Sequence, residues 1–154
     1  MIYFKVLRAK GGLKMITNSK ELWLEEKQNA LYDALEEIEN VLNYGESDVP
    51  YYGDFDEQIE FIKDNIGYLE ELEKDIEKFL ESDIESQGHD VNIILEEIAE
   101  ILWIDENNLP YNTTFGYKMV YIARKFTEIK RVLRNLQGTL DDYDRDEPWH
   151  TGID

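Results

Sequence analysis

The stretch that decides the fold is FDEQIEFIKDNIGYLEELEKDIEKFL, residues 55–80, because its apolar side chains recur every three or four residues. That period is the period of one helix face, so it predicts a long amphipathic helix that begins near Asp54. Gly67 lies inside the pattern, and since glycine weakens a helix interior by about 1 kcal/mol relative to alanine, the sequence leaves open whether the helix bends or breaks there. Ser86-Gln87-Gly88 is expected to end the helix. The predicted core positions are Phe55, Ile59, Ile62, Ile66, Leu69, Leu72, Ile76, Phe79 and Leu80.

Another amphipathic helix is predicted before this stretch, from about Lys20 to Asn43, so that residues 55–80 form the second helix of the chain. Asn18 is a suitable N-cap, because an asparagine side chain can accept hydrogen bonds from the first backbone amides of a helix. Gly45 is expected to stop the helix, since glycine readily adopts the left-handed conformation that closes helices. The connection that follows, GESDVPYYGD, has the composition of a loop.

Two more helices are predicted after it. One is capped by Asp90 and is apolar on nearly every face through Ile104, which is typical of the buried member of a bundle. The other is capped by Thr113 or Thr114 and carries apolar residues at alternating steps of four and three, as in a coiled coil, up to Gly138.

The pattern therefore predicts an all-α fold, an antiparallel bundle of about four amphipathic helices with a long second helix. A dimer that shares helices is the alternative. We identify no tandem repeat. The bundle domain is expected to span residues 15–138, followed by an acidic C-terminal tail, residues 139–154. Residues 1–14 form a short N-terminal extension with four basic and no acidic side chains, which is either a strand or a translated leader before a natural start at Met15.

Composition excludes several classes of function. The chain has 154 residues and a net charge of −19, so it should be repelled by nucleic acids and by anionic membranes. No apolar run is long enough for a membrane span. The absence of cysteine excludes disulfides and thiolate chemistry and fits a reducing compartment, so we expect a cytoplasmic protein that binds neither nucleic acid nor membrane.

The sequence contains no convincing catalytic, cofactor or metal motif. His150 follows Glu147 at the spacing of a di-iron ligand pair, but the chain holds too few histidines for such a site. Acidic stretches near Asp83 and Asp142 lack the closing glutamate of a calcium loop. We therefore expect no enzymatic activity, no cofactor and no metal.

The distribution of charge is the most informative feature for function. Residues 21–106 carry 28 acidic and four basic side chains, whereas residues 113–138 carry one acidic and six basic side chains. On the helix over residues 55–80 the carboxylates opposite the apolar stripe recur about every 5 Å, against about 3.4 Å between the charges of a DNA strand. Two such helices side by side would approach the charge density of a nucleic acid. The predicted partner-binding face comprises Asp56, Glu57, Glu60, Asp64, Glu70, Glu71, Glu77 and Glu81 on the second helix and Glu25, Glu26, Asp33 and Glu36 on the first.

This face predicts a nucleic-acid-mimicking inhibitor or decoy that occludes the basic channel of a nucleic-acid-handling protein. Its composition is typical of the small acidic inhibitors that phages and mobile elements deploy against CRISPR or restriction enzymes, although no motif of one family is matched. The alternative is a helical protein–protein interaction or scaffold protein, either a monomer or a homodimer, that binds through a patch such as Tyr44, Tyr51 and Tyr52.

Overall fold

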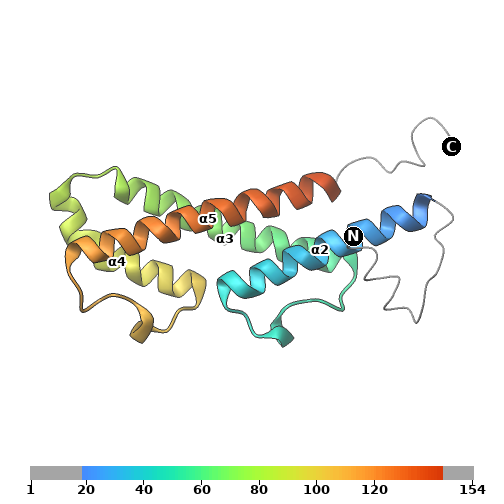
Figure 1. The fold of residues 1–154 in the computed structure, drawn as a ribbon, viewed down its shortest axis with the longest axis horizontal. Coiled ribbons are helices and arrows are strands. Elements are labelled where there is room, and N and C mark those ends of the chain that lie inside the picture. Colours follow the sequence, from blue (N-terminus) through green and yellow to red (C-terminus); the bar gives the residue numbers. More distant parts are fainter. Residues whose placement is uncertain (1–18, 144–154) are drawn as a thin grey trace.

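The protein is an all-α helical bundle, as the sequence predicts (Figure 1). The computed structural model describes residues 19–143, and within that range it contains no strand. Its four α-helices are α2 (Ser19–Leu42), α3 (Phe55–Leu80), α4 (Ile84–Leu102) and α5 (Phe115–Tyr143), with short 3-10 helices η1 (Glu46–Asp48) and η2 (Glu106–Asn108) in the two long connections.

The helices are arranged around a central antiparallel pair, α3 and α5, with α2 and α4 placed end to end along it (Figure 1). The C-termini of α2 and α4 meet, and there the Asn43 side chain donates a hydrogen bond to the Leu102 carbonyl at 2.7 Å. Toward the other end of α2, the Lys27 ammonium donates a hydrogen bond to the backbone carbonyl of Asp142, near the end of α5.

The expectation of a simple antiparallel bundle is therefore only partly met. Residues 43–54 run back beside α2 before α3 begins, so that α2 and α3 point in the same direction (Figure 1). Residues 103–114 do the same between α4 and α5. A connection of about twelve extended residues at roughly 3.3 Å each can span the length of a short helix, so its length alone does not select an antiparallel neighbour.

The two halves of the bundle are structural repeats separated by 60 residues, which our reading of the sequence missed. Each half consists of a helix, a 3-10 turn and a long helix: residues 31–76 form the first repeat and residues 91–136 the second. The sequence LEEI occurs at 35–38 and 95–98, and Pro-Tyr at 50–51 and 110–111. Burial along residues 31–40 is matched position for position by residues 91–100.

The two repeats are related by an approximate twofold axis, because a contact made by a residue of the first repeat with the second has an equivalent in which the two repeats change places. Glu37 of α2 contacts Asn135 of α5, and the equivalent pair, Glu97 of α4 and Asp75 of α3, is also in contact.

The core lies between α3, α5 and the helix that covers them at each end. Leu35, Leu69 and Ile122 are fully buried, as is Ile98. The two buried polar side chains hold the first connection in place: Gln58 donates to the Pro50 and Tyr51 carbonyls, and Asn65 accepts from the Tyr44 hydroxyl.

Several predicted helix boundaries are wrong. The long helix α3 ends at Leu80, and Asp83, not Asp90, caps α4 by accepting from the Ser86 amide at 2.8 Å. Residues 86–88 thus lie inside α4, because an aspartate cap outweighs one exposed glycine. Helix α4 is also not buried all round, since its Ile93 side chain is 61% exposed.

Other boundary predictions concern glycines. Helix α3 runs without a break through Gly67. Helix α2 is closed by Asn43 in the left-handed region, at φ 58°, and not by Gly45. Helix α5 passes Gly138 and continues to Tyr143, so residues 139–143 belong to a helix and not to the predicted tail. The Thr114 cap of α5 is confirmed, since its hydroxyl accepts from the Tyr117 amide at 3.1 Å.

The predictions for residues 1–18 and 144–154, including the Asn18 cap and the choice between Met1 and Met15 as the start, lie outside the described residues.

Candidate functional site

The predicted acidic face is exposed. The eight carboxylates predicted on the second helix occupy the arc of α3 opposite its core residues, with Glu81 at its C-cap. Of the four predicted on α2, Glu26, Asp33 and Glu36 are exposed and Glu25 is half-buried. The hydrogen bond from Tyr44 to Asn65 puts the end of α2 beside the middle of α3. The predicted α3 carboxylates before Asn65 therefore lie beside α2, and those after it lie along the half of α3 that α4 covers (Figure 1).

Eight of the twelve residues of this acidic face belong to the first repeat, and Glu25, Glu26, Glu77 and Glu81 lie outside it. Residues 31–76 carry 15 acidic and two basic side chains, a net charge of −13, whereas the equivalent residues 91–136 carry six of each and no net charge. The second repeat has apolar side chains, Ile93, Tyr117 and Val120, where the first has Asp33, Glu57 and Glu60. These three apolar side chains are 61, 52 and 47% exposed. One backbone arrangement thus carries two different surfaces.

Basic side chains of α5 face the acidic repeat. Arg131 forms an ion pair with Glu37 of α2 at 3.5 Å, and the Asn135 amide donates to the same carboxylate at 3.2 Å. Gln137 donates a hydrogen bond to Glu70 of α3 at 2.8 Å. Glu70, a residue of the predicted acidic face, therefore also links α3 to α5. Part of the acidic charge is therefore compensated within the bundle.

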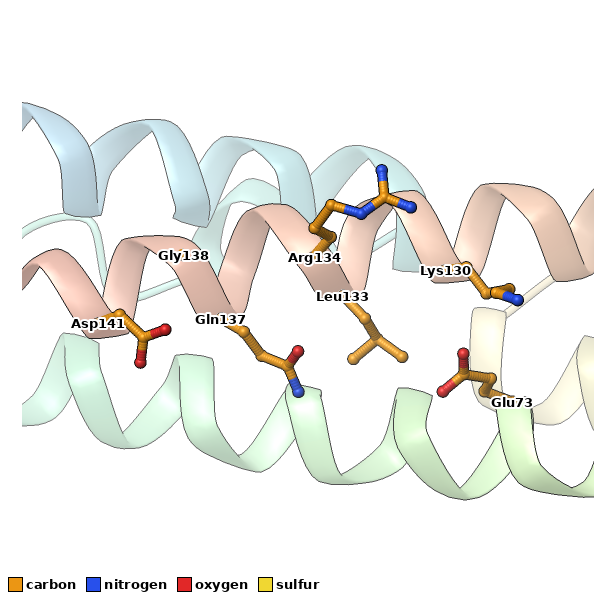
Figure 2. Close-up of a pocket in the computed structure, with 7 residues that line it drawn as sticks. All are labelled: Glu73, Lys130, Leu133, Arg134, Gln137, Gly138 and Asp141. Carbon is orange, nitrogen blue, oxygen red and sulfur yellow. The ribbon is translucent and has the colours of Figure 1, made fainter.

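A groove of about 490 Å³ follows the junction of α3 and α5. Figure 2 shows Glu73 of α3 directed toward the α5 side chains Lys130 and Gln137, while Arg134 points to the opposite side of α5, toward α2. The groove is lined by charges of both signs, which suits mutual compensation between the helices better than binding of a ligand of one charge.

A carboxyl pair between α3 and α4 is a feature that sequence reasoning missed. Glu97 is half-buried and within hydrogen-bonding reach of Asp75, with Glu71 and Glu100 nearby. Burial, together with the hydrogen bond and the negative charge of Asp75, raises the pKa of Glu97 from 4.5 to about 8. In the other repeat the equivalent Glu37 meets Asn135 and Arg131, which are compatible with its charge. The spacing of these residues in the sequence gives no sign of the pair, because it forms across two helices.

The predicted tyrosine patch is mostly packed into the fold. The Tyr51 ring is buried and its hydroxyl donates to the Glu39 carboxylate, so burial and the neighbouring negative charge raise its pKa. Tyr44 is half-buried and donates to Asn65 at 2.9 Å. Tyr52 alone of the three is exposed, at 97%.

A second groove, of about 570 Å³, lies where the C-termini of α2 and α4 meet beside the middle of α5. Trp103 lines it and is 64% exposed. Its neighbours in the lining include Asp105, and also Lys125 and Glu128, which form an ion pair at 3.4 Å. The sequence pattern predicts that Trp103 belongs to a buried helix, because it follows an almost continuous apolar run.

The chain matches no protein-family model, no curated protein and no solved structure with which it was compared. None of the helices between residues 19 and 143 is long and apolar enough to cross a membrane. Within the same range, no three histidine, aspartate or glutamate side chains gather as a set of metal ligands.

Proposed function

We propose that this protein binds, through the carboxylates of α2 and α3, the basic nucleic-acid-binding surface of another protein and excludes nucleic acid from it. It acts as a decoy by occlusion and catalyses no reaction. Such an inhibitor of the anti-CRISPR or anti-restriction type works in the cytoplasm, where its targets handle nucleic acid. The protein itself binds neither nucleic acid nor membrane.

The observation that carries this proposal is the charge difference between two repeats of one fold. The second repeat folds in the same arrangement with no net charge, so the net charge of −13 on the first repeat is not a requirement of the fold. Uncompensated like charges destabilise a compact state. A row of them along the outer face of the rigid helix α3, extended by those of α2, is best explained by a positively charged partner.

The mechanism follows from the density of charge. Carboxylates along α3 are fixed to a rigid helix, so a basic channel can contact them without ordering a flexible chain first. Opposite charges would also accelerate the encounter, and this acceleration falls as salt is added. Binding should therefore be strongly salt-dependent and should be competed by DNA or RNA.

The experiment begins with the immobilised protein in a bacterial lysate at low salt. Bound proteins are eluted with a short DNA duplex or RNA at constant ionic strength and identified by mass spectrometry. We expect elution by nucleic acid, and an affinity for the purified partner that falls steeply with salt. Partners that nucleic acid does not displace, with a salt-independent affinity, would rule out mimicry.

A charge-reversal variant locates the surface. The variant Glu57→Lys, Glu60→Lys, Glu70→Lys, Glu71→Lys and Glu77→Lys should lose partner binding while circular dichroism shows intact helices. The matched control reverses five acids near the C-terminus, Asp141, Asp142, Asp144, Asp146 and Glu147, and should bind much as the wild type does. Equal binding by both variants would remove α3 from the interface.

The scaffold alternative is favoured by one observation, the exposed Ile93, Tyr117 and Val120 of the second repeat. An interface built on them would be salt-insensitive, and in a homodimer it would be seen directly by sedimentation velocity. Val120→Glu would dissociate such a dimer but would leave binding of a basic partner by α3 unchanged.

A further inference from the structure

Trp103 adopts a backbone conformation that its side chain disfavours. It follows α4 at φ 55° and ψ 47°, in the left-handed region. Bulky residues rarely occupy that region, because Cβ approaches the carbonyl oxygen. Its indole is also 64% exposed, so burial offsets little of that cost.

The fold does not require a tryptophan at this position. The equivalent residue of the first repeat is Asn43, which closes α2 at φ 58°. Both turns have the same backbone hydrogen bond, Tyr44 N to Glu39 O at 3.2 Å and Ile104 N to Ala99 O at 3.0 Å. Asparagine is a favoured residue for a left-handed helix end, and Asn43 also gains a hydrogen bond to the Leu102 carbonyl. A strained, exposed tryptophan at the matching position points to a role other than folding.

The surroundings of Trp103 are suited to a positively charged group. The C-terminal ends of α2 and α4 meet in this groove, and each carries the negative end of a helix dipole. The acidic residues of the groove lining are Asp105, whose carboxylate accepts from the Asn107 amide, and Glu128. Lys125 is the basic residue in the groove lining, and it is already paired with Glu128 and placed over the Tyr121 ring at 5.6 Å.

We propose that Trp103 is an anchor that stacks on an arginine side chain of the basic partner, with the guanidinium seated in the groove between α2 and α4. This inference rests on the proposed function and names a specific contact for its partner. An arginine fits better than a lysine because its planar cation stacks on an indole while its edge donates hydrogen bonds to carboxylates and carbonyls. The Tyr44 ring, 5.9 Å from the Trp103 ring, supports the indole from one side.

The first test uses the fluorescence of Trp103 itself. In a variant with Trp23→Phe and Trp149→Phe, Trp103 is the remaining tryptophan. Titration with an octa-arginine peptide at low salt should quench or shift its emission, and octa-lysine at the same concentration should do so much less. No change with octa-arginine, or equal changes with both peptides, would overturn the proposal.

The second test separates binding from folding. Trp103→Asn should raise the melting temperature by roughly 2–4 °C, because it relieves strain, and should weaken binding of labelled octa-arginine about two- to fivefold. Tyr52→Asn removes another exposed aromatic side chain outside the groove and should change neither quantity. A lower melting temperature for Trp103→Asn, unchanged peptide affinity, or an equal loss with Tyr52→Asn would each overturn the proposal.

The failure of this anchor and the failure of the proposed function are read from different measurements. The anchor is tested by Trp103→Asn with a peptide, at unchanged charge on α3. The proposed function is tested by charge reversal on α3 and by competition with DNA or RNA.

Discussion

Replacement of Glu97 by glutamine should stabilise the protein, and more so as the pH rises. Glu97 of α4 faces Asp75 and Glu71 of α3 and has Glu100 on its own helix, while Lys78 and Asp90 line the same surface groove. At neutral pH and above, the contact between α3 and α4 therefore places negative charges close together unless Glu97 keeps its proton. The glutamine side chain is neutral, nearly the same in shape, and able to donate a hydrogen bond to Asp75.

The sign follows from the raised pKa. Glu97 titrates near pH 8 in the folded protein and near 4.5 otherwise, so between these values the folded state binds a proton that the unfolded state has lost. The contribution of this group to stability is greatest below about pH 4.5 and declines as the pH rises through about 8. One pKa unit corresponds to about 1.4 kcal/mol, but Glu97 is partly exposed and solvent screens its interactions, so we expect a loss of about 1–2 kcal/mol between pH 5 and 8.

The measurement is thermal unfolding at pH 5, 6.5 and 8. Glu97→Gln should match the wild type at pH 5 and exceed it by roughly 3–6 °C at pH 8. Asp75→Asn should do the same, because it supplies the amide that Asn135 provides in the other repeat. The matched control is Glu37→Gln, which loses the ion pair with Arg131 and should gain nothing at pH 8. A Glu97→Gln advantage that is independent of pH, or is shared by Glu37→Gln, would refute this account.

Two further predictions test the packing. Gly67→Ala should raise the free energy of unfolding by about 0.5–1 kcal/mol, measured by urea denaturation, because the position is exposed in mid-helix and an added Cβ meets no atom within 4 Å; a loss of stability would show that α3 needs the glycine. Ile122→Asp should abolish cooperative unfolding, because the side chain is fully buried and a carboxylate there would be unpaired, whereas Ala123→Asp, on the exposed side of α5, should change the melting temperature little.

Helix type and core residues were predictable because they depend on local periodicity. Each of Ile62, Leu69 and Ile76 lies three or four residues from the next apolar position, and all are fully buried. The helix ends were harder to predict, because several polar residues near each end can serve as the N-cap. Asp83 and Asp90 both had suitable side chains, and the apolar pattern of the helix did not distinguish them.

The direction of α2 relative to α3 was not predictable from helix patterns, because an amphipathic stripe packs equally well in either direction. The information lay in the connections. Residues 43–54 and 103–114 share a left-handed helix end, a 3-10 turn and a Pro-Tyr pair, and comparison of the two would have shown the repeat. Most residues differ between the repeats, and the net charges of the two repeats differ by 13, so composition concealed the relation.

The acidic face was predictable as a set of exposed positions, because charged residues opposite an apolar stripe point to solvent. The lower charge of the second repeat at equivalent positions could not be recognised without knowledge of the repeat. The left-handed conformation of Trp103 was not predictable either, because Trp103 follows an apolar helix pattern.

The twofold arrangement also explains how so acidic a surface is compatible with a stable fold. Pairing of two repeats places α5 of the second against α2 and α3 of the first, so Arg131 reaches Glu37 and Gln137 reaches Glu70 from within the bundle. These contacts offset repulsion at the helix junctions but leave the outward row, such as Asp56, Glu60 and Asp64, facing solvent. If the charge served solubility alone, an even distribution over both repeats would give the same net charge with less local repulsion. The observed separation, a neutral repeat that supports a strongly acidic one, is the arrangement expected when the outer face of α2 and α3 must match a positively charged partner.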